Sequence, residues 1–85
     1  MKVFSIYDKK ACTFSPSFTC SHAAEAARSF ADLCNDPKTT IFKFSSDFAL
    51  YELAEFDQST GSFACIQPPK LLHDANEFKR SEENV

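Results

Sequence analysis

Lysines and phenylalanines interleave in one short segment of this chain, between residues 38 and 46. The segment reads KTTIFKFSS and sets Lys38 and Lys43 among the rings of Phe42 and Phe44. Proteins that bind single-stranded nucleic acid contact phosphates with basic side chains and stack bases on aromatic rings. These four residues are therefore candidates for binding single-stranded DNA.

Two further lysines, Lys9 and Lys10, would join this candidate site if the turn that carries them lies nearby. In the alternative interpretation, Ile41 or Phe44 fills the core and the lysines are only solvated. Of the two interpretations, we favour this alternative.

Other residues that could do chemistry are poorly placed for it. The four cysteines are far apart and contain no C-x₂-C pair: Cys12, Cys20, Cys34 and Cys65. Only His22 and His73 accompany them, which is too little for a zinc site, so we expect four free thiols and no metal. The single glycine, Gly61, excludes a glycine-rich phosphate loop. We expect no cofactor and no enzymatic activity.

The elements that must position these residues centre on a β-hairpin at 47–69. Alternation of apolar residues over 48–56 predicts a strand. The run 57–61 predicts a turn, because Gly61 can adopt a positive φ, and Ser62 to Gln67 then returns as the second strand. Pro68 and Pro69 should end the ladder, since proline has no N–H to donate.

One carboxylate pair lies on the first strand of this hairpin. Glu52 and Glu55 are three residues apart, which places them on opposite faces of a strand. We therefore interpret them as solvated or edge charges rather than as an acid–base pair.

One helix is predicted between His22 and Cys34, with Ser21 as its N-cap. Apolar residues at helical spacing form its buried stripe: Ala23, Ala26, Ala27, Phe30, Leu33 and Cys34. Phe30 lies at the middle of this stripe and should anchor the core. Asn35 is suited to a left-handed position after the last turn, and the Asp36-Pro37 pair prevents continuation.

The remaining segments complete an α+β fold. The run 2–7 is rich in β-forming residues, and 11–18 should return as a second strand whose far end is limited by Pro16. Residues 38–46 could be an extended loop or a short strand, and 70–78 should form one or two helical turns. We therefore predict a small antiparallel sheet, in the order β-β-α-β-β, packed against one main helix with a short C-terminal helix. Residues 1–80 should be one domain, and 81–85 a flexible charged tail.

Charge and hydropathy limit the partners. The net charge of −3 argues against strong non-specific attraction to nucleic acid, although it permits a local basic patch. No run of 18 apolar residues is present, and Lys9 and Lys10 interrupt the apolar N-terminal stretch, so we expect neither a membrane span nor a signal peptide. The strand at 48–56 is apolar on both faces, whereas one helix covers one face, which predicts a homodimer.

Motifs in a fixed order along residues 3–80 resemble a known family. They are Phe4-x-Ile6-Tyr7-Asp8-x-Lys10-Ala11; Ala27-Arg28-x-Phe30-x-Asp32 with Asn35-Asp36-Pro37; Asp47-Phe48-x-Leu50-Tyr51-Glu52-Leu53 with Phe56-Asp57 and Thr60-Gly61; and Pro69 and Leu72 with Ala75-x-Glu77-Phe78-Lys79. The set resembles the small nonstructural protein of gokushovirus-type microviruses, tailless phages with circular single-stranded DNA. The chain departs from that pattern at Ala54, where glycine is frequent, and along 38–46.

The resemblance implies a non-capsid role in genome replication or packaging, in the cytoplasm of a bacterial host. Members of that family are described as DNA-binding, or are compared with the microvirus protein C. Two hypotheses follow. The protein binds single-stranded DNA as an accessory factor, or it acts as an adaptor for the replication initiator or for a host replication protein without binding DNA.

Overall fold

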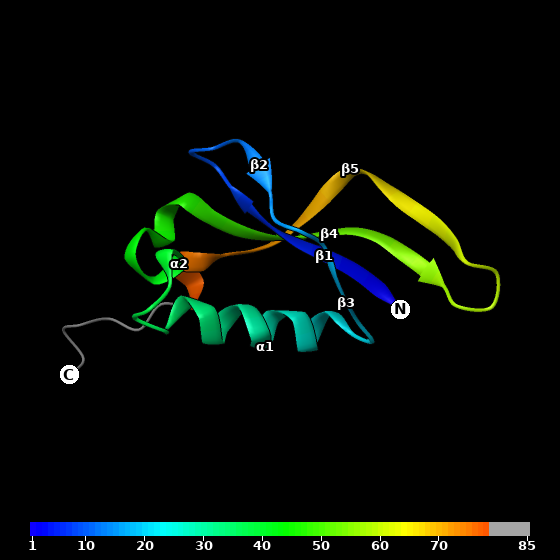
Figure 1. Cartoon of the computed structure of the whole chain (residues 1–85), viewed down its shortest axis with the longest axis horizontal. Helices are drawn as coiled ribbons and strands as arrows, with labels where there is room; N and C mark the ends of the chain where they lie inside the picture. The colour runs from blue at the N-terminus through cyan, green and yellow to red at the C-terminus, as the bar shows by residue number, and fades with distance from the viewer. Residues whose placement is uncertain (79–85) are drawn as a thin grey trace.

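Three strands, a helix, two short helical segments, a long hairpin and a final helical turn follow one another along the described residues (Figure 1). This computed structural model describes residues 1–78, so the predicted tail at 81–85 lies outside the described residues. The elements are β1 (Lys2–Asp8), β2 (Thr13–Phe14), β3 (Phe18–Cys20), α1 (Ala23–Cys34), α2 (Thr40–Lys43), η1 (Ser45–Asp47), β4 (Phe48–Asp57), β5 (Ser62–Asp74) and η2 (Ala75–Glu77).

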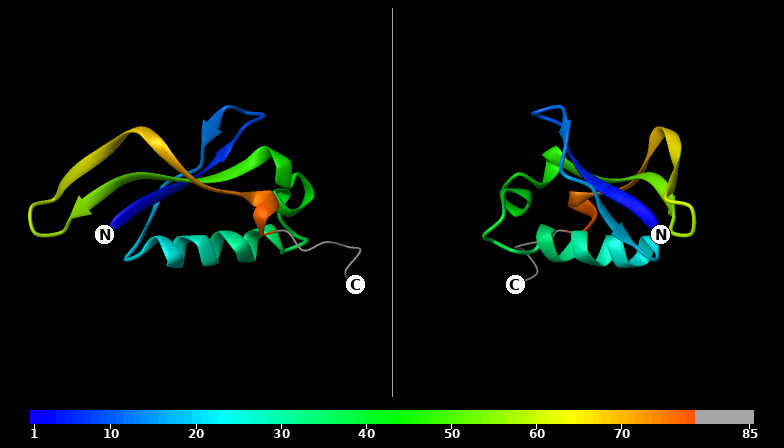
Figure 2. Two further views of the ribbon diagram at one scale, coloured as in Figure 1. Left: turned by 180° about the vertical axis from the view of Figure 1, so that it is seen from behind. Right: turned by 45° about the vertical axis from the view of Figure 1, so that its right-hand side comes forward.

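The strands form one antiparallel sheet of five, in the order β2-β1-β4-β5, with β3 also paired to β1. Helix α1 runs along one face of the sheet, and no helix formed by residues 1–78 covers the opposite face in the views of Figure 2. This arrangement confirms the predicted α+β class, with an antiparallel sheet packed against one main helix.

The core lies between α1 and the sheet. Phe4, Phe30 and Leu50 are completely buried there, together with the small residues Ala26 and Cys34. The ring of Phe30 also meets Phe78 edge to face, with centroids 6.1 Å apart. The predicted anchor role of Phe30 is thus supported by its position.

Helix α1 begins one residue later than predicted, and its cap differs. His22 is the N-cap residue and makes no side-chain cap bond, whereas the hydroxyl of Ser21 lies 3.7 Å from the sulfur of Met1. The prediction of Ser21 as the cap is wrong, because the offset removes its oxygen from the first-turn amides. Asn35 is not left-handed, with φ −107°. Its Nδ2 instead donates to the carbonyls of Ala31 and Phe78, at 2.9 and 2.8 Å.

The segment predicted as an extended loop or strand at 38–46 is mostly helical. The hydroxyl of Thr39 accepts a bond from the N–H of Phe42 at 3.1 Å and lies 2.8 Å from the carbonyl oxygen of Leu33. It therefore caps α2 and ties the cap to the end of α1, which outweighs the strand preference of the β-branched residues.

The first hairpin is shorter than predicted. Strand β1 is confirmed, but the expected return over 11–18 pairs only at Thr13–Phe14 and resumes at Phe18–Cys20. Ser15 donates its N–H to the carbonyl of Ile6 at 2.8 Å, and Pro16 then interrupts the ladder because it has no N–H.

The long hairpin has the predicted turn. Gly61 has φ +75°, and its N–H donates to the carbonyl of Asp57 at 2.7 Å. The prediction that Pro68 and Pro69 end the ladder is wrong, since β5 continues to Asp74.

A register shift explains how the prolines are accommodated. Ala54 pairs with Cys65 and Glu52 pairs with Lys70, so the residues between Cys65 and Lys70 exceed those of the facing strand. Pro68 and Pro69 fall among these extra residues, where no ladder bond is needed. Residues 70–74 are consequently strand, and the predicted C-terminal helix is reduced to the single turn η2.

Candidate nucleic-acid interface

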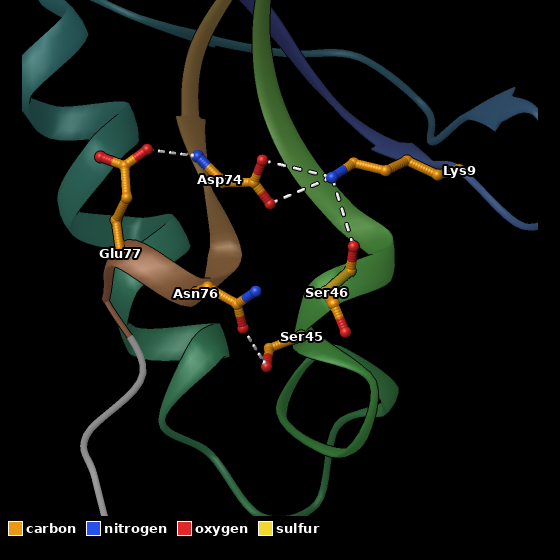
Figure 3. A network of polar contacts seen from close by, with 6 residues as sticks. All are labelled: Lys9, Ser45, Ser46, Asp74, Asn76 and Glu77. Carbon is orange, nitrogen blue, oxygen red and sulfur yellow. Dashed lines mark hydrogen bonds and ion pairs between the residues drawn. The ribbon is translucent and has the colours of Figure 1, made fainter.

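The turn between β1 and β2 lies beside η1, close to the candidate segment at 38–46. The N–H of Lys9 donates to the carbonyl of Asp47 at 2.7 Å, and its Nζ donates to the carbonyl of Ser46 at 3.2 Å. The turn that carries Lys9 and Lys10 therefore lies near residues 38–46, as their inclusion in the candidate site requires. Figure 3 shows Lys9 reaching across β4 toward Ser46.

The charge of Lys9 is already balanced within the chain. Its Nζ lies 3.1 and 3.2 Å from the two carboxylate oxygens of Asp74, at the end of β5 (Figure 3). The Oγ of Ser45 donates to Oδ1 of Asn76 at 2.8 Å and makes a second link between η1 and η2. Lys9 thus links the β1–β2 turn to η1 and to the end of β5, and it contributes little net charge to a ligand site.

A second set of polar contacts, made by Glu77, lies at the same end of the sheet. One oxygen of Glu77 accepts the N–H of Asp74 at 2.7 Å, and the other lies 3.1 Å from Nδ1 of His73. The bond from Asp74, and then the one from His73, lower the pKa of the Glu77 carboxyl. The carboxylate caps η2, which is a structural use of the residue.

The other predicted site residues fall into two groups. Lys10, Lys38 and Lys43 are exposed, and Phe44, directly after Lys43 at the end of α2, has 57% of its surface exposed. Phe42 is half-buried.

The alternative interpretation, in which Ile41 or Phe44 fills the core, is met by Ile41 alone. Ile41 packs against the core, as a structural role requires. Phe44 does not fill the core and remains on the surface beside a lysine.

Acidic side chains limit how positive this surface can be. Asp8 accepts the N–H groups of Lys10 and Ala11, and Asp36 accepts the N–H of Lys38. These carboxylates lie close to Lys10 and Lys38 in the chain and reduce the positive potential around them.

Sequence reasoning missed an aromatic cluster on the sheet. The rings of Tyr7, Phe14 and Tyr51 have centroids 4.6 to 5.8 Å apart, and none of them belongs to the core under α1. Tyr7 alternates with Phe4 and Ile6 along β1, so it lies on the face that α1 does not cover. That alternation was visible in the sequence, but the pairing with Phe14 and Tyr51 depends on the register of three strands.

A part-buried ion pair was also missed. Glu52 has only 9% of its side chain exposed and lies 3.3 Å from Nζ of Lys2. The prediction that Glu52 is solvated is wrong, because the pairing of β1 with β4 brings Lys2 to it. Glu55 is exposed, as expected.

The cysteines differ in their surroundings, and all four are free thiols. Cys12 and Cys65 are exposed, whereas burial raises the pKa of the Cys34 thiol to about 11. Within residues 1–78, no three histidine, cysteine, aspartate or glutamate side chains gather as metal ligands would.

The described residues form a small α+β domain whose surface carries exposed lysines and aromatic rings. Residues 1–78 match the family described as Phage ORF5 protein, and the chain belongs to that family. It is therefore a phage protein. Neither the curated proteins nor the solved structures contain a significant match to it. Among the described residues, no helix is long and apolar enough to cross a membrane.

Proposed function

We propose that this protein acts in the replication or packaging of a single-stranded DNA phage genome by binding single-stranded DNA. The observation that carries the proposal is the placement of Lys43 and the exposed Phe44 at the end of α2. The turn with Lys10 is tied to η1, the segment that follows. Membership of a phage family and the resemblance to gokushovirus nonstructural proteins agree with this role. The site of action would be the cytoplasm of the bacterial host.

In this proposal, Phe44 stacks on a base and the lysines contact phosphates. Phe44 supplies a ring for stacking, worth roughly 1–3 kcal/mol per base and tolerant of base identity. Lys43, Lys10 and Lys38 contact phosphates, and each phosphate contributes only about −0.7 to the slope of log affinity against log salt for single strands. Binding is therefore weak, indifferent to sequence and better for single than for double strands. Nothing in this scheme needs a cofactor or a catalytic step.

The test is a fluorescence titration of a labelled oligonucleotide across a salt series. The double variant Lys43→Ala with Phe44→Ala should lose most of the affinity and flatten the salt slope. Lys70→Ala is the matched control for charge, because this exposed lysine lies on β5, away from α2. If the double variant binds as wild type does while its circular dichroism is unchanged, the segment is structural and this proposal fails.

An adaptor role is the second candidate, and the uncovered sheet face favours it. Phe14 and Leu71 are 43% and 53% exposed, and both lie beside Tyr51 on the face that α1 does not cover. Apolar side chains grouped on a face in this way are typical of a protein contact. A titration against the purified replication initiator of the same phage, with wild type and with Phe14→Ser, separates the two roles. Loss of initiator binding in the variant, together with no DNA binding in wild type, would favour the adaptor.

A further inference from the structure

The outer half of the β4–β5 hairpin extends beyond the part of the sheet that α1 covers (Figure 1). The molecule measures 48 Å along its longest axis and 24 and 19 Å along the others. β1 pairs with β4 as far as Glu55, and Met1 exchanges main-chain bonds with Phe56, so only the Asp57–Ser62 pair lies beyond the N-terminal strand. On the other side of β5, no strand of the described residues pairs with it.

Strand β5 is an edge strand, and its two halves differ in chemistry. The inner half contains Pro68, Pro69 and Lys70, residue types that prevent another strand from pairing with an edge. The outer half reads SFACIQ over 62–67 and contains no charge and no proline. The part of the edge that leaves the body of the protein is thus the part without protection.

The outer half also exposes apolar surface. Phe63 is 61% exposed, and its ring packs only partly against Phe56, with centroids 4.8 Å apart. A hollow of about 580 Å³ lies beside the two rings and reaches Met1. A second strand laid along this edge would cover part of Phe63 and extend the sheet past β5.

We propose that the outer edge of β5 pairs, in antiparallel order and about a two-fold axis near Ala64, with the same edge of a second copy of this chain. The strand is self-complementary, because residues 62–67 are uncharged and no like charges meet across the axis. In antiparallel order the turn with Asp57 lies toward the partner's Lys70, so opposite charges flank the pairing at both ends. Main-chain bonds of this kind join strands across many protein interfaces.

This dimer is independent of the proposed DNA surface. The hairpin turn and α2 lie at opposite ends of the long axis in Figure 1. A dimer would therefore present two copies of the α2 surface far apart and facing away from the axis. Failure of either proposal leaves the other intact.

The first test is the mass in solution by light scattering, over a range of protein concentrations. Wild type should reach twice the monomer mass of 9.5 kDa. Phe63→Lys and Ala64→Lys should each give the monomer, because lysines near the axis repel and stay hydrated. Phe44→Lys is the matched control, since it makes the same change at a ring with similar exposure and should remain dimeric.

The second test is hydrogen exchange of wild type and needs no variant. Protection of the amides at 62–66 should increase with protein concentration, while the amides of α1 should not change. A monomer mass at every concentration would overturn the proposal. So would a dimer that survives both lysine variants and shows no added protection along this strand.

Discussion

The ammonium of Lys9 lies 3.1 Å from Oδ1 of Asp74, and 65 residues of sequence separate the two. The contact joins the turn after β1 to the last residue of β5, and the carbonyl of Ser46 adds η1 to the same lysine. This end of the molecule is thus held by polar side chains, whereas the opposite end is a projecting hairpin.

The two partners of this ion pair should contribute unequally to stability. Both side chains are more than a third exposed, so Lys9→Ala should cost under about 1 kcal/mol. Asp74 also caps η2, and Asp74→Ala should cost roughly 1 kcal/mol more. Urea unfolding of the two single variants and the double variant measures the difference. Equal costs for the two single variants would show that the cap contributes nothing.

Phe30 should be the most sensitive position of α1. It is completely buried between the helix and the sheet, and Phe30→Ala should cost ~3–5 kcal/mol. A domain of this size has little more stability than that. Thermal unfolding followed by circular dichroism is the measurement, and Phe44→Ala is the exposed control, expected within about 0.5 kcal/mol of wild type. A melting temperature of Phe30→Ala close to that of wild type would contradict the packing described.

Glu52 should matter far more than Glu55. Glu52→Ala leaves Lys2 without its partner and opens a site that is 9% exposed, which should cost about 1–3 kcal/mol. Glu55 is exposed, so Glu55→Ala should change stability by less than about 0.5 kcal/mol. Denaturant midpoints of the two variants give the comparison. Similar midpoints would mean that the ion pair does not hold in solution.

Cys34 should be unreactive in the folded protein. Burial raises the pKa of its thiol from 9.0 to about 11, so almost no thiolate exists near neutral pH. Alkylation followed by mass spectrometry should modify Cys12 and Cys65 first and Cys34 only after unfolding. Rapid labelling of Cys34 in native protein would contradict this.

Ionisation of the Cys34 thiol should lower the free energy of unfolding at alkaline pH. The folded pKa of Cys34 is above the unfolded one, so folding favours the protonated thiol and this stabilisation is complete below pH 9. It decreases as pH rises from about 9 to about 11, because the unfolded chain ionises first. Cys34→Ala should reduce this dependence without abolishing it, because the pKa values of Cys20 and Tyr7 are also raised. Denaturant unfolding of wild type and variant across that pH range would measure the difference.

Local patterns were enough to predict the parts of this fold that depend on neighbouring residues. The helical spacing of Ala26, Phe30 and Cys34 identified the buried face of α1, because a helix that packs on one side repeats every three to four residues. Gly61 identified the hairpin turn, since its φ of +75° suits a residue without a Cβ. Strand β1 was likewise readable from its β-forming residues.

Other features were decided by partners distant in sequence. Strand β5 continues past Pro68 and Pro69 because its register with β4 shifts there. The extra residues of β5 then need no ladder bonds to β4. Glu52 is buried because strand pairing delivers Lys2, 50 residues away, as its counter-ion. The aromatic cluster of Tyr7 and Tyr51 likewise follows from register.

At the candidate site, too, some features follow from the local sequence and others only from tertiary contacts. The sequence by itself determined which lysines and rings are available at 38–46, but not which of them face solvent. Thr39 was equally suited to a strand or to a helix cap, and its contact with Leu33 selected the helix that leaves Phe44 exposed. The sequence offers Lys9 as a candidate for phosphate binding, whereas in the structure Asp74 balances its charge. The residue types in the sequence define which contacts with a ligand are possible. Tertiary contacts decide which side chains can make them, because a polar group that is already hydrogen-bonded within the protein is less able to bind a ligand.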